Sequence, residues 1–162
     1  MTLAPAHRVP TSCSTVESVL VPIHDRWLDE IRRFVEPAAA PRAGFWDRWA
    51  ATRYFADQFR DHFVRERALL VALASVMSPG DAERLTAQAG ELERLLSDLD
   101  RIGRRRGTGP AVAEEAHRLM DEIAVWCAEL ELATSSLRLD ALPSEAARAL
   151  EHVAASGAIG FP

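Results

Sequence analysis

Residues 53–73 read RYFADQFRDHFVRERALLVAL and carry the pattern that decides the fold. Side chains recur in this segment at steps of four, three, four, three and four residues, which gives one stripe: Phe55, Phe59, His62, Glu66, Leu69 and Leu73. These steps place the six side chains on one face of an α-helix. The stripe predicts a helix over residues 42–77 that buries this face, including its two polar members.

The remainder of the chain carries further helical periods separated by proline and glycine. The alternating β-branched segments that indicate strands are nearly absent. Proline and a capping serine are typical of helix starts, and they predict helices that begin near Pro22, Pro79, Pro110 and Ser144. The first, second and last of these helices are expected to end near residues 36, 102 and 157.

The 162 residues are expected to form one all-α domain. Long amphipathic helices joined by short loops are typical of an up-down four-helix bundle. The expected organisation is an N-terminal arm over residues 1–21, the bundle over residues 22–137, and a short fifth helix with a C-terminal tail over residues 138–162.

Charge and cysteine usage restrict the classes of function. The 19 basic and 24 acidic residues give a formal charge of -5, which disfavours a general nucleic-acid binder because phosphate contacts need a net basic face. Cys13 and Cys127 are too widely separated for a redox pair or a zinc knuckle, and they indicate a reducing compartment. The N-terminus has no apolar run long enough for a signal peptide or a membrane span, so a cytoplasmic location is expected.

Three polar residues occupy positions where apolar side chains belong. His62 and Glu66 interrupt the stripe one turn apart, and His24 lies on the apolar face of the helix predicted over residues 22–36. A buried carboxylate or imidazole is costly unless it is paired or bound to a metal. Two histidines and one carboxylate form the open-sided ligand set of non-heme Fe(II) sites. A metal-free interpretation stays open, because His62 and Glu66 can satisfy each other across one turn and His24 can be a helix-start histidine.

Residues 59–70, FRDHFVRERALL, resemble the second-helix motif of the hemerythrin-like (HHE cation-binding) family. The shared features are a His-Phe pair, a glutamate four residues after the histidine, and a leucine-rich continuation. The resemblance implies a four-helix bundle with a non-heme di-iron centre between its helices. It also implies a first-helix histidine, matched by His24, and a fourth-helix histidine followed five residues later by a carboxylate, matched by His117 and Glu122.

The chain departs from this pattern in the helix predicted over residues 79–102, where the family supplies further histidines and this sequence has Ala87 and Ala89. A second match to the last motif, at His152, lacks the carboxylate. The predicted metal ligands are therefore His24, His62, Glu66, His117 and Glu122, in a reduced or altered site. A mononuclear site or an asymmetric pair is expected rather than a full di-iron centre.

Two functions are expected, of which the first is implied by the resemblance to the hemerythrin-like family. The first is a hemerythrin-like protein that binds or senses O₂ or a related small oxidant at non-heme iron, with an oxidase or oxygenase as a variant. The second is a metal-free bundle that serves as an interaction or accessory subunit, with a protein partner or a second copy of the chain. Neither function involves nucleic acid or a membrane.

Aromatic residues are dense at the start of the helix predicted over residues 42–77: Trp46, Trp49, Tyr54 and Phe55. Such a group either lines a pocket for a flat ligand or packs as core at the end of the bundle. Core packing is the expected role.

Overall fold

The computed structural model describes residues 14–104 and 110–156, and these residues are helical throughout most of their length. The elements in chain order are α1 (Val16–Ala39), α2 (Phe45–Arg53), the π-helix η1 (Tyr54–Phe59), α3 (Arg60–Leu73), α4 (Pro79–Arg104), α5 (Pro110–Thr134), the short 3₁₀ helix η2 (Leu139–Ala141) and α6 (Ser144–Ser156). Within the described ranges there is no strand, only an isolated bridge between Thr15 and Arg138. The predicted all-α bundle is confirmed.

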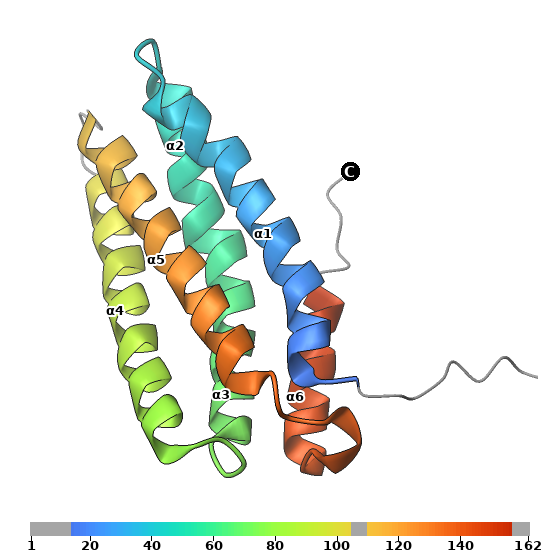
Figure 1. The fold of residues 1–162 in the computed structure, drawn as a ribbon. Coiled ribbons are helices and arrows are strands. Elements are labelled where there is room, and N and C mark those ends of the chain that lie inside the picture. The colour runs from blue at the N-terminus through green and yellow to red at the C-terminus, as the bar shows by residue number, and fades with distance from the viewer. Residues whose placement is uncertain (1–13, 105–109, 157–162) are drawn as a thin grey trace, which may run out of the picture.

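The long helices alternate in direction along the bundle (Figure 1). α1 runs from one end to the other, the continuous α2–η1–α3 segment returns, α4 runs back, and α5 returns again. α5 packs against both α1 and α4, and α6 packs mainly against α3 and also touches α1. This arrangement brings α1, α3, α5 and α6 together at the level of the site described below.

The first helix begins at Val16, six residues before the predicted start at Pro22. Thr15 caps it, because its side-chain oxygen accepts a hydrogen bond from the backbone N–H of Ser18 at 3.3 Å. Val16 and Leu20 are fully buried in the core. Burial of these residues together with the cap offsets the cost of a proline inside a helix. Residues 1–13 of the predicted arm lie outside the described residues.

The stripe that runs through residues 53–73 is buried as predicted. Its six members are each at most 2% exposed, including His62 and Glu66. The helix that carries them begins at Phe45 and is regular except at η1, where the chain makes a π-turn over Tyr54–Phe59. Such turns insert a residue into the helical repeat and often occur near functional sites. Phe55 and Phe59 lie within this turn and are buried, directly before the polar part of the stripe.

The other helix starts also follow the sequence signals. Ser78 caps α4, since its Oγ accepts a hydrogen bond from the backbone N–H of Asp81 at 3.2 Å. α5 begins at Pro110 and α6 at Ser144, as predicted. No helix in residues 14–104 and 110–156 combines the length and the apolar character needed to cross a bilayer.

The aromatic start of α2 differs from the prediction. Tyr54 and Phe55 are core residues, but Trp46 is 72% exposed and Trp49 is 46% exposed. The inward face of α2 is formed by the small residues Ala51 and Thr52. α4 approaches this face so closely that a Cβ on Gly103 would clash with Thr52. Small residues thus occupy the face of α2 that meets α4, and the two tryptophans are exposed.

Candidate functional site

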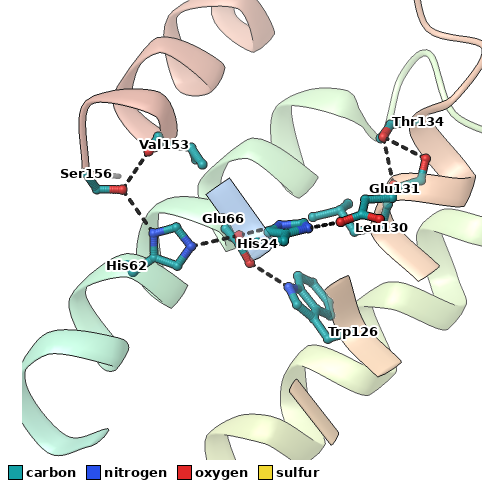
Figure 2. Close-up of polar contacts among 9 residues, drawn as sticks. All are labelled: His24, His62, Glu66, Trp126, Leu130, Glu131, Thr134, Val153 and Ser156. Atoms are coloured by element: carbon teal, nitrogen blue, oxygen red, sulfur yellow. Dashed lines mark hydrogen bonds and ion pairs between the residues drawn. The ribbon is translucent and has the colours of Figure 1, made fainter. Parts of the chain in front are cut away.

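A buried hydrogen-bonded cluster joins four helices in the interior of the bundle. We call it the Glu66 cluster, and it consists of His24 on α1, His62 and Glu66 on α3, Trp126 and Glu131 on α5, and Ser156 on α6. Figure 2 shows His24, His62 and Trp126 directed at the carboxylate of Glu66, with Glu131 joined to the far side of His24 and Ser156 to the far side of His62.

Both carboxylate oxygens of Glu66 are satisfied by protein donors. Oε1 accepts hydrogen bonds from Nε2 of His24 at 2.9 Å and from Nε2 of His62 at 2.8 Å. Oε2 accepts a hydrogen bond from the indole Nε1 of Trp126 at 2.6 Å. Burial alone raises the pKa of Glu66, but its interactions with His62 and His24 outweigh burial and hold this pKa well below the usual range. Glu66 is therefore an ionised carboxylate with a complete set of donors.

His24 lies between two carboxylates. Its Nε2 contacts Glu66, and its Nδ1 is 2.6 Å from Oε1 of Glu131. Since ionised carboxylates only accept hydrogen bonds, both ring nitrogens must donate, and the ring is an imidazolium. Burial lowers the pKa of His24, but contacts with the Cys127 thiol and with Glu66 outweigh burial and raise this pKa to about 11. The proton on Nε2 therefore belongs to the folded structure at neutral pH.

The ring of His62 is held along its edges and on one face. Its Nε2 donates to Glu66, and its Nδ1 is 3.0 Å from the hydroxyl of Ser156. The same hydroxyl lies 2.6 Å from the backbone carbonyl of Val153 and donates to it. Trp27 stacks on the imidazole face with ring centroids 4.2 Å apart and planes inclined by 28°. These contacts fix the orientation of the ring toward Glu66.

The spacing of residues within the helices accounts for this convergence. His62 and Glu66 are one turn apart on α3, so an imidazole and a carboxylate from the same stripe can meet. Trp126 and Glu131 are five residues apart on α5 and straddle its inner face, so that one reaches Glu66 and the other reaches His24. Cys127, the next residue after Trp126, is a buried free thiol beside His24.

The structure brings together three of the five residues that the sequence predicts as a site, namely His24, His62 and Glu66. His117 and Glu122 are not brought to this cluster. The Nδ1 of His117 contacts the carbonyl of Ala113 in its own helix at 3.0 Å. No hydrogen bond or ion pair among the described residues joins His117 or Glu122 to Glu66, and His117 lies about 14 Å from Trp126 along the axis of α5.

Three members of the cluster were missed by sequence reasoning: Trp126, Glu131 and Ser156. The five-residue spacing that pointed to His117 and Glu122 recurs between Trp126 and Glu131, nine positions further along the same helix. A search restricted to histidine overlooks this register because its first member is a tryptophan. Ser156 gave no signal, since a serine near a helix end is ordinary.

The arrangement of donors is that of a hydrogen-bonded network. Among residues 14–104 and 110–156, no group of three or more His, Cys, Asp or Glu side chains is arranged so that it could hold a metal ion. The nitrogens of His24 and His62 contact one oxygen of Glu66 directly at hydrogen-bond distances.

An aromatic surface lies on the outer side of α2, at the end of the bundle away from α6 (Figure 1). We use this name for Phe45, Trp46 and Trp49, which are all exposed. Phe45 and Trp46 meet edge to face with ring centroids 5.3 Å apart, and Trp46 and Trp49 meet in the same way at 5.9 Å. Large exposed aromatic side chains in contact with one another are typical of interaction surfaces.

Comparisons of this chain with family models, with curated proteins and with solved structures found no match.

Proposed function

We propose that this chain is a metal-free helical bundle that acts as an interaction or accessory subunit, with the Glu66 cluster as a structural lock in its interior. The observation that carries the proposal is that protein side chains alone satisfy the hydrogen-bonding groups of the Glu66 carboxylate. Donors from α1, α3 and α5 satisfy both oxygens of Glu66, and each of these donors is itself held in the core. Buried polar groups that are fully hydrogen-bonded fix one arrangement of the surrounding helices.

The residues do not fit the di-iron centre that a resemblance to the hemerythrin-like family implies. α4 faces the core with aliphatic side chains and Ala89 and has no histidine. Where α5 meets Glu66 it presents Trp126, whose indole N–H can only donate a hydrogen bond and cannot bind a metal. We therefore derive no chemistry at a di-iron centre for this chain.

Positive charge at the centre of the cluster is supplied by a proton. A buried carboxylate needs a nearby cation or several donors to remain ionised. The imidazolium of His24 provides that charge to Glu66 and also pairs with the half-buried Glu131. In a metal site, the ion would supply the positive charge that keeps the carboxylate ionised. Here the protonated ring of His24 supplies that charge.

The aromatic surface supports the interaction role. Tryptophan and phenylalanine are enriched at the centres of protein interfaces, where they contribute much of the binding free energy. Trp46 and Trp49 together present two indole rings on one short helix. A protein partner that covers these rings would remove a large apolar area from water.

Chemical crosslinking of the full chain in extracts of its source cells tests this role. We expect crosslinked partners to be lost in the Trp46→Ser/Trp49→Ser variant and retained in a matched Val125→Ser/Leu132→Ser variant, which removes exposed apolar side chains from α5. Identical crosslinks in both variants would contradict the role of the aromatic surface. Sedimentation of the purified variants separates a second copy of the chain from a different partner.

A second candidate function is favoured by one specific observation. Nε2 of His24 and Nε2 of His62 face the same oxygen of Glu66, while the Nδ1 atom of each ring is held by a further side chain. In metal sites, a hydrogen bond at the ring nitrogen that does not bind the metal orients the histidine in the same way. One divalent ion such as Fe(II), with an open position for O₂ or a related oxidant, would then replace the protons between the rings and Glu66.

The two candidates respond differently to a chelator. A bound ion stabilises only the folded state, so a chelator would lower the melting temperature of a metal protein. We expect the melting temperature of the purified, untagged chain to be unchanged by EDTA. A drop of several degrees, absent in a His62→Ala variant, would favour the ion-binding candidate.

A further inference from the structure

A groove runs between α3 and α6 on the exposed side of these helices. It contains an open hollow of about 430 Å³, which lies within the size range of small-molecule sites. Its apolar part is formed by Val64 and Ala68 of α3 and by Ala149 of α6. Val64 is 56% exposed, although it is a large aliphatic residue on a packed helix. We call this feature the α3–α6 groove.

Three basic side chains line the α3–α6 groove: Arg65, Arg148 and His152. Arg65 forms an ion pair with Asp61 at 2.7 Å. The one hydrogen bond of Arg148 within the described residues is a long contact of its Nε with the carbonyl of Ser144, at 3.4 Å. The terminal nitrogens of that guanidinium therefore have no carboxylate partner in this part of the chain. His152 is exposed at the same rim.

The balance of charge in the groove is opposite to that of the chain. The protein carries a formal charge of -5 with histidine counted as neutral, whereas on the same count the groove lining combines two arginines with a single acid, Glu145. A guanidinium with unused donors is a good partner for a carboxylate or a phosphate. The neighbouring aliphatic side chains would meet an apolar body attached to that group.

We propose that the α3–α6 groove binds a small amphipathic anion. The carboxylate or phosphate head of the ligand contacts Arg148 and His152, and its apolar body lies on Val64, Ala68 and Ala149. This site is separate from the Glu66 cluster and from the aromatic surface, and it does not depend on the proposed function. The ligand would contact the outer faces of α3 and α6. The inner faces of these two helices are joined by the contact between His62 and Ser156.

Titration of the ¹⁵N-labelled full chain by NMR tests this proposal. The probes are sodium octanoate and octyl phosphate, which share an apolar chain and a negative head, with octyltrimethylammonium and acetate as comparisons. We expect octanoate, octyl phosphate or both to shift the amide signals of Val64, Ala68 and Ala149. Octyltrimethylammonium and acetate should each bind at least about tenfold more weakly, because each lacks one of the two parts. The two anionic probes distinguish a carboxylate ligand from a phosphate ligand.

Variants of exposed residues provide the controls. The Arg148→Gln/His152→Gln variant should bind the anionic probe about tenfold more weakly, and Glu145→Gln should bind it more tightly because a like charge is removed. Arg33→Gln, an exposed arginine on the later half of α1, should bind like wild type. Equal binding of octyltrimethylammonium, equal binding of acetate, unchanged affinity in Arg148→Gln/His152→Gln, or no shift at the groove would each overturn the proposal.

Discussion

The indole nitrogen of Trp126 on α5 donates a hydrogen bond of 2.6 Å to Oε2 of Glu66 on α3. This bond completes the set of donors around a carboxylate that is 1% exposed, and it ties together two helices whose contacting residues lie 60 positions apart in the chain. The tryptophan thus contributes both a large apolar ring and a specific polar contact to the core.

Removal of this donor should destabilise the protein. The Trp126→Phe substitution keeps an aromatic ring but leaves Oε2 of Glu66 buried without a partner, which costs about 1–3 kcal/mol. Urea denaturation of the variant and of wild type would measure the difference. Trp46→Phe is the matched control and should change the free energy of unfolding by less than about 0.5 kcal/mol, because Trp46 is exposed. Equal effects of the two substitutions would contradict the role of Trp126.

Replacement of Glu66 together with its three donors should lower the free energy of unfolding less than removal of Glu66 alone. Glu66→Met alone removes the acceptor of three buried donors, the Nε2 atoms of His24 and His62 and the indole N–H of Trp126. We expect a loss of about 3–5 kcal/mol in the free energy of unfolding. In the quadruple variant His24→Leu/His62→Leu/Glu66→Met/Trp126→Phe the polar partners are removed together, so most of that loss should be recovered. Thermal or urea unfolding of both variants measures this. A quadruple variant as unstable as the sum of its single changes would contradict a closed network.

The pH dependence of stability follows from His24 and Glu66. The folded-state pKa of His24 is raised from 6.5 to about 11, so its contribution to stability is fully present below pH 6.5 and is lost as the pH rises toward 11. The folded-state pKa of Glu66 is lowered from 4.5, so its contribution is present above pH 4.5 and is lost as the pH falls below that value. Stability should therefore be greatest between about pH 4.5 and 6.5.

Unfolding experiments between pH 6 and 10 test the contribution of His24. Wild type should lose stability with a slope of up to about 1.4 kcal/mol per pH unit. His24→Gln should be less stable at pH 6 and should have a flatter profile, while exposed His152→Gln should retain the wild-type slope. A His24→Gln profile parallel to wild type would show that His24 does not hold its proton as proposed.

The sequence predicted the helices and the inward stripe well but the site only in part. Periodicity is a local property, so the buried face through Phe59, His62, Glu66 and Leu69 could be derived from spacing alone. Helix starts followed proline and serine, except at α1, where buried Val16 and Leu20 outweighed the signal of Pro22. Prediction of the partners of Glu66 required the register of α5 against α3, which depends on packing between segments distant in the chain.

Ser156 gives α6 a polar attachment to the cluster. Ser156→Ala removes the contact with Nδ1 of His62 and should cost about 1 kcal/mol. Because α6 packs mainly on α3, the effect should be local. Hydrogen–deuterium exchange should become faster in α6 and stay unchanged in α4. A uniform increase in all helices, or none in α6, would contradict this attachment.

The central claim, that protons rather than a metal ion hold His24, His62 and Glu66 together, is tested most directly by metal content. The measurement is elemental analysis of the untagged full chain after anaerobic incubation with Fe(II) and desalting, beside His62→Ala and the exposed-residue control His152→Ala. We predict that all three proteins retain far less than one equivalent of iron. Close to one ion per chain in wild type and His152→Ala, lost in His62→Ala, would contradict the claim and establish the cluster as a metal site.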